Sequence, residues 1–195
     1  MSSPDIAAHA LLPRWLDRAL GGLYLLAGWL AGAFLVAIFL IMLGLSAGRP
    51  LGIDIPSGDD LASWCMAAVA FLGLAHTFRS GEIIRVGLLI ERVRGKARRL
   101  LEIAVLAIGL AAIAYFAWYA IDMTRTSLRF NDLSQGVVVV PLWIPQLGFS
   151  AGLAILTIAF ADELLHVLAG GRPRYEKPEP ATAEDVVERA MQSGA

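Results

Sequence analysis

The chain has 195 residues, of which 57% are hydrophobic and 17% are charged, and its mean hydropathy is +0.66. In a soluble domain about a quarter of the residues are charged, so this composition excludes an ordinary soluble domain and predicts an all-α membrane protein. The net charge of -1 conceals a strong segregation of basic residues along the chain. The single cysteine, Cys65, excludes an internal disulfide and any site with several cysteine ligands.

Residues 1–18 are polar and form a short N-terminal segment. The uncharged run that follows predicts a first transmembrane helix at about 19–47. At about 1.5 Å per residue this helix is longer than the ~30 Å hydrocarbon core, so we expect it to tilt. The apolar region of a cleaved signal peptide is shorter, about 7–15 residues, so we expect the helix to be retained.

A turn-rich loop leads to a second uncharged run, which predicts a span at about 61–78. Asp59 or Asp60 can cap this helix at its N-terminus. Trp64 lies near the start of the span, where an aromatic side chain suits the headgroup region.

The next segment, residues 79–102, is strongly basic and patterned. Its apolar residues recur at i, i+3, i+4 and i+7, whereas Arg85, Arg92 and Arg99 lie on the opposite side of a helix. Such a helix prefers a membrane surface, with its arginines among phosphates. We therefore predict an in-plane basic helix at about 82–99. Its candidate contacts to lipid or to a partner subunit are Arg85, Arg92, Lys96 and Arg99.

A third span is predicted at about 101–122 and a fourth at about 143–168, joined by a polar and then β-branched connection. Trp143 is a second candidate interface anchor. The membrane domain thus covers residues 19–169, and the Pro-rich, charged residues 170–195 predict a flexible tail.

Thirteen of the sixteen Lys and Arg residues lie in the N-terminal segment, the basic segment and the tail. Because positive residues are retained on the cytoplasmic side, this count predicts four spans with both termini cytoplasmic.

No span has an Asp, Glu, Lys or Arg near its middle. Transported ions and proton relays usually require such groups inside the bilayer, so we expect no ion site, no catalytic site and no metal site in this chain. His76 and His166 fall at similar depth near the cytoplasmic ends of their spans. An alternative hypothesis is therefore a haem- or quinone-binding membrane anchor of an oxidoreductase, with these two histidines as ligands.

Small-x-x-x-small pairs, which allow helices to approach closely, are candidate packing sites at Gly28 and Gly32 and at Gly148 and Gly152. A third hypothesis is a free-standing membrane protein that associates with itself through these glycines. On the outer side, the candidate docking residues for another protein are Asp59, Asp60, Arg125, Arg129 and Asp132.

Two sequence motifs suggest a family. A basic Gly-x-x-x-Arg-Val segment after the second span comprises Gly81, Arg85 and Val86. A Ser-x-Gly…Pro-x-Trp-x-x-Gln entry into the fourth span comprises Ser134, Gly136, Pro141, Trp143 and Gln146. With the four-span layout, these motifs resemble the small permease subunit (DctQ-like) of the tripartite ATP-independent periplasmic (TRAP) transporters, over roughly residues 15–170. The chain departs from the family at Ile83 and Gly87, where members often have His and Asp.

The resemblance implies a bacterial inner-membrane complex for the sodium-coupled uptake of an organic acid. A large permease subunit (DctM-like) would hold the sodium and substrate sites, and a periplasmic binding protein (DctP-like) would deliver the substrate. The present chain would be a scaffold without a cofactor. Its partners would be these two proteins and membrane lipids, and no nucleic acid.

Overall fold

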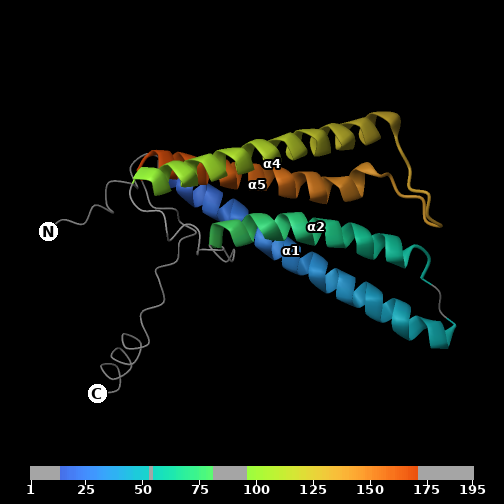
Figure 1. The fold of residues 1–195 in the computed structure, drawn as a ribbon. Helices are drawn as coiled ribbons and strands as arrows, with labels where there is room; N and C mark the ends of the chain where they lie inside the picture. The colour runs from blue at the N-terminus through green and yellow to red at the C-terminus, as the bar shows by residue number, and fades with distance from the viewer. Residues whose placement is uncertain (1–13, 53–54, 81–95, 171–195) are drawn as a thin grey trace, which may run out of the picture.

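The computed structural model describes residues 14–52, 55–80 and 96–170, to which all structural statements below refer (Figure 1). Its long helices are α1 (Arg14–Gly48), α2 (Gly58–Ser80), α4 (Lys96–Phe130) and α5 (Trp143–Leu168), and a short 3₁₀ helix, η3 (Arg49–Leu51), follows α1. These 4 helices are long and apolar enough to cross a membrane. The predicted all-helical class with four long apolar segments is thereby confirmed.

The helix bounds differ most from the predicted spans in α4. Residues 122–130, which we expected in the connection, are helical, because no Gly or Pro interrupts them. The helix ends where Asn131 adopts a φ of 53°, a left-handed conformation common just after a helix C-terminus. At its other end α4 includes residues 96–99, and residues 82–95 of the predicted in-plane helix lie outside the described part of the chain.

The helices form two antiparallel hairpins, α1–α2 and α4–α5, which pack together through α2 and α5 (Figure 1). The spatial order is therefore α1, α2, α5, α4, with α2 and α5 in the centre. Buried residues are scarce on α1 and α4 and more frequent on α2 and α5. The outer helices consequently present long apolar faces to their surroundings, as a lipid-exposed bundle requires.

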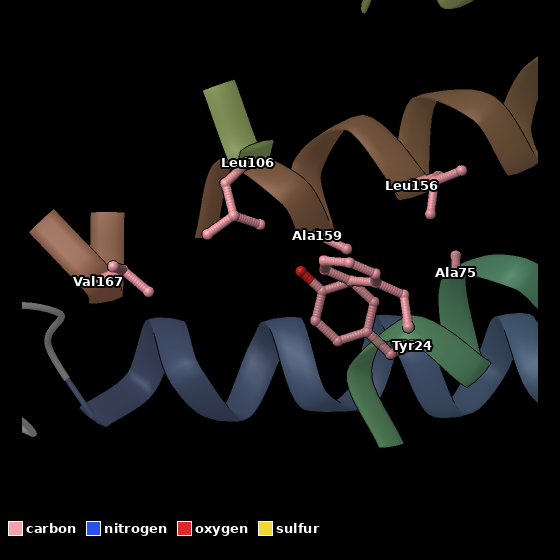
Figure 2. Packing of buried hydrophobic residues seen from close by; sticks show 7 residues of the cluster. Tyr24, Ala75, Leu106, Leu156, Ala159 and Val167 are labelled. Carbon is pink, nitrogen blue, oxygen red and sulfur yellow. The ribbon is translucent and has the colours of Figure 1, made fainter. Parts of the chain in front are cut away.

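The main core lies where α1 begins and α5 ends. It contains Tyr24 of α1, Ala75 and Phe78 of α2, Leu106 of α4, and three residues of α5, namely Leu156, Ala159 and Val167. Figure 2 shows Tyr24 projecting from α1 toward α5, with its ring close to Ala159. Phe78 stacks on Phe160 with ring centroids 4.1 Å apart. Side chains from all four long helices therefore meet at this end of the bundle.

The central contact between α2 and α5 depends on glycine. A Cβ atom at Gly152 would lie 2.6 Å from the carbonyl carbon of Phe71 and 2.8 Å from the backbone nitrogen of Leu72. A Cβ at Gly148 would lie 2.8 Å from the Cβ of Ala68. Both distances are too short for van der Waals contact, so the missing side chains let the two backbones approach.

A hydroxyl pair joins α4 to α5. The Oγ atoms of Thr124 and Ser150 lie 2.7 Å apart, and each is within 3.0 Å of the carbonyl oxygen of Ala120. Each hydroxyl has a single proton, so only two of these three contacts are hydrogen bonds at any moment. Both side chains are buried, which makes the shared carbonyl a specific link between the helices.

We expect Gly152→Ala to destabilise the bundle, because the new methyl group would overlap the α2 backbone. Overpacking of this kind costs typically about 1–3 kcal/mol. The measurement is the apparent melting temperature of the detergent-purified protein. Gly32→Ala is the matched control, since nothing lies within 4 Å of that Cβ position. Equal melting temperatures for the two variants would contradict the assigned contact.

We expect Thr124→Val and Ser150→Ala to be coupled energetically, because each removes a partner of the other. Double-mutant cycles on hydrogen bonds inside membrane proteins average about 0.6 kcal/mol, with a maximum of about 1.7 kcal/mol. Unfolding of both single variants and the double variant in mixed micelles measures the coupling. Strictly additive losses would show that the contact between the two hydroxyls adds nothing to stability.

Candidate functional site

Charged side chains of the described helices lie toward the helix ends. At the end where α4 begins and α5 finishes, Glu102, Asp162 and Glu163 are buried between helices. Glu102 accepts a hydrogen bond of 3.0 Å from Nε of Arg98, one helical turn away. Asp162 and Glu163 lie in the last two turns of α5, and their side chains are enclosed by protein. Among the described residues no group of His, Cys, Asp and Glu is suited to hold a metal ion.

Arg99 connects the start of α4 to the end of α5. Its Nη2 donates to the carbonyl oxygens of Val167 at 3.4 Å and of Leu168 at 3.1 Å. Carbonyls at a helix C-terminus lack helical partners and carry partial negative charge, so a guanidinium stabilises them. Of the other candidate basic residues, Lys96 begins α4, whereas Arg85 and Arg92 lie outside the described residues.

His76 packs against the backbone of α1. Its Nδ1 lies 3.1 Å from the carbonyl oxygen of Tyr24. Its ring occupies the space beside Gly28, where a Cβ atom would lie 2.8 Å from the imidazole. Gly28 is therefore at an α1–α2 contact, while the Cβ position of Gly32 faces open space. Because the Nδ1 side of His76 is directed at α1, this histidine has a structural partner within the bundle. His166 lies in the last turn of α5.

The candidate docking residues gather at the opposite end of the bundle. Asp59 and Asp60 are in the first turn of α2, and Arg125 and Arg129 are in the last turns of α4 rather than in a loop. Asp60 is half-buried, whereas the other candidates, Asp132 included, are exposed. Trp64 and Trp143, the candidate anchors, are half-buried at the same end of their helices.

The loop between α4 and α5 is ordered by residues to which we had assigned no role. The Oγ of Ser134 donates to the carbonyl of Val138 at 3.1 Å and accepts from the amide of Val140 at 3.0 Å. Ser57, just before α2, accepts from the amide of Val138 at 3.0 Å. The Ser-x-Gly motif gave the only sequence signal for this arrangement, and it pointed to Ser134 but not to Ser57.

Comparison with protein families gives one strong result. The model of the family described as "Tripartite ATP-independent periplasmic transporters, DctQ component" matches residues 38–170. The matched region includes the last part of α1, all of α2, α4 and α5, and the connections between them.

The comparison with individual curated proteins gives no match. The family match covers more than half of the chain and agrees with the resemblance noted in the sequence. The chain therefore belongs to the DctQ component family of the tripartite ATP-independent periplasmic transporters.

Proposed function

We propose that the chain is the fixed scaffold subunit of its transporter. It supports a large permease subunit during the sodium-coupled uptake of an organic acid, which a periplasmic binding protein delivers. The coarser statement, that this is a multi-pass membrane component of a TRAP transporter and not an enzyme, follows from family membership. This family membership favours a transporter subunit over the alternative hypothesis of a haem- or quinone-binding anchor.

The observation that carries the proposal is the absence of ionised groups from the middle of the bundle. Between Arg18 and Arg49, from Leu61 to Phe78, from Ile103 to Ile121 and from Trp143 to Ala161, the sequence has no Asp, Glu, Lys or Arg. Sodium and carboxylate ligands at the membrane midplane normally bind to polar side chains or to broken helices. The described helices are continuous in these stretches. A second chain must therefore supply the transport site.

The large apolar faces of α1 and α4 supply the surface for such a partner. On α1 the exposed residues include Trp29, at 74% exposure, and Phe39, at 63%; on α4 they include Trp118, at 69%, and Ile108, at 71%. Lipid tails and a second membrane protein both suit such faces. The scaffold would thus contact the large subunit along one outer helix and lipid along the other.

We also propose a bacterial inner membrane as the location, as the family implies, with both termini in the cytoplasm. The orientation is supported by the high share of Lys and Arg in the N-terminal segment, the basic segment and the tail. The part of the predicted in-plane basic helix that precedes α4, residues 82–95, would fix the depth and tilt of the bundle by binding phosphate headgroups. On the outer side, the charges of Asp59, Asp60, Arg125, Arg129 and Asp132 would help to orient the binding protein as it approaches.

We expect the purified chain alone, reconstituted in liposomes, to accumulate none of a panel of labelled carboxylates on a sodium gradient. The same chain reconstituted with a co-purified large permease subunit should accumulate at least one, but only when the binding protein is present. Purification in mild detergent from the native host provides the large subunit, and the soluble binding protein is prepared separately and added. Sodium-driven accumulation by the chain alone would overturn the proposal, because a scaffold cannot transport.

We expect Arg85→Gln/Arg92→Gln to lower the yield of the assembled complex, since these substitutions remove headgroup contacts from the basic helix. Arg99→Gln should also lower it, through the lost contact with the end of α5. Co-purification of the large subunit measures both effects. Arg172→Gln/Arg174→Gln is the control, because it removes the same charge from the tail. If all these variants assemble like the wild type, the role assigned to the basic segment is wrong.

A further inference from the structure

The connection between α4 and α5, residues 131–142, has a defined shape. Leu133 and Pro141 form an isolated antiparallel bridge, and the amide of Ser134 donates to the carbonyl of Val140 at 2.9 Å. Inside this turn, the Ser134 side chain bonds to the backbone of Val138 and of Val140. The Ser134 hydroxyl thus hydrogen-bonds to the Val138 carbonyl and to the Val140 amide, which would otherwise require water. These bonds within the loop stabilise its conformation.

This loop is also fastened to the other hairpin. The amide of Val138 donates to the Oγ of Ser57 at 3.0 Å. Gly136 lies directly over the start of α2, where an added Cβ would approach Oδ2 of Asp60 to 2.5 Å and Oγ of Ser57 to 2.9 Å. A side chain at position 136 would therefore displace the ends of the Asp60 and Ser57 side chains. Ser57, Asp60 and Gly136 therefore fix the position of the loop relative to both hairpins.

The fixed loop displays apolar side chains outward. Val137 is 84% exposed, Val139 59% and Val138 43%. Within the described part of the chain, the backbone amide and carbonyl groups of Val137 and Val139 make no hydrogen bonds. The three valines are β-branched and apolar, and they lie beside backbone groups that have no partner in the described protein. The loop that carries them is held in place by hydrogen bonds. The valines therefore form a preorganised surface. We call residues Val137–Val139 the valine tip.

The position of the valine tip argues against lipid as its cover. The 35 residues of α4 extend about 52 Å, well beyond the ~30 Å hydrocarbon core. The last turns of α4 carry the exposed charges of Asp122, Arg125 and Arg129, which belong at or beyond the headgroups. The loop follows these turns and lies at the end of the molecule (Figure 1). The valine tip therefore faces water, where exposed apolar surface is unfavourable.

We propose that the valine tip is a docking surface for a soluble protein on the outer side of the membrane, namely the binding protein of the function proposed above, on which this inference rests. The partner contributes an apolar patch against the side chains and backbone groups that pair with the free groups of Val137 and Val139. The nearby charges of Asp59, Arg125 and Arg129 steer the approach, and the valine tip makes the close contact.

The size of the valine tip suits a contact that forms and breaks in every transport cycle. A stable interface buries on the order of 800 Å² per partner, far more than three valine side chains provide. The valine tip is thus one element of a weak, transient interface, which allows the binding protein to leave once it is empty.

The test uses the complete three-component transporter in proteoliposomes. We expect Val137→Gln/Val139→Gln to raise the KM for the loaded binding protein roughly fivefold or more, the loss typical of an interface residue that matters. The kcat and the yield of the complex should not change. Leu51→Gln is the matched control, because Leu51 is a comparably exposed apolar residue (73%) in η3. It should leave the KM unchanged.

A photoreactive residue placed at position 137 should, in the same preparation, crosslink to the binding protein, whereas one at position 51 should not. An unchanged KM in the Val137→Gln/Val139→Gln variant, or a crosslink from position 137 to lipid or to the large subunit alone, would overturn this docking assignment. The proposed function would then still stand if uptake depends on the binding protein. Uptake by the wild type without any binding protein would overturn both.

Discussion

The close approach of α2 to α5 is the contact on which the rest of the bundle depends. In a membrane, helices gain little from leaving lipid for protein, because both environments are apolar, so association relies on close packing and hydrogen bonds. Gly148 and Gly152 supply the close packing, since any side chain there would overlap α2. The outer helices α1 and α4 then each pack on one of the central pair, and they need few buried residues of their own.

Contacts at the two ends of the bundle complement this central contact. At one end Arg99 binds the last carbonyls of α5, and at the other Ser57 holds the α4–α5 loop. The hairpins are therefore joined near the middle, through the main core at the end where α5 finishes, and through the α4–α5 loop at the opposite end. This distribution favours movement of the described chain as one body. The scaffold role that we propose requires a subunit of this kind.

The fold was largely predictable from hydropathy, and the bounds of α5 agree with the fourth predicted span, because apolar runs bounded by charge leave little choice in a membrane. Residues 122–130 were harder. Their polar side chains resemble a loop, and only the absence of Gly and Pro indicated that α4 continues. The glycine pairs show a different limit. Spacing alone puts Gly28 and Gly32 on one face of α1, but of these two only Gly28 contacts α2.

The sequence predicted the surface features that consist of charged residues, but not those that consist of apolar residues. The acidic and basic residues near the α4–α5 loop stood out in the sequence. The run of valines in that loop resembled any apolar stretch of a membrane protein, and its exposure depends on three-dimensional contacts of Ser134 and Ser57. Similarly, the basic pattern placed Arg99 with its neighbours in a surface helix. It could not reveal that its guanidinium reaches the end of a helix almost seventy positions away.

The contact between the His76 ring and Gly28 restricts the substitutions that these two positions can accept during evolution. The imidazole fills the volume that any larger residue at position 28 would need, and it meets the α1 backbone through the Tyr24 carbonyl. A substitution at one of these two positions therefore limits the residues that fit at the other. A protein that gains a methyl group at 28 needs a smaller or displaced side chain at 76.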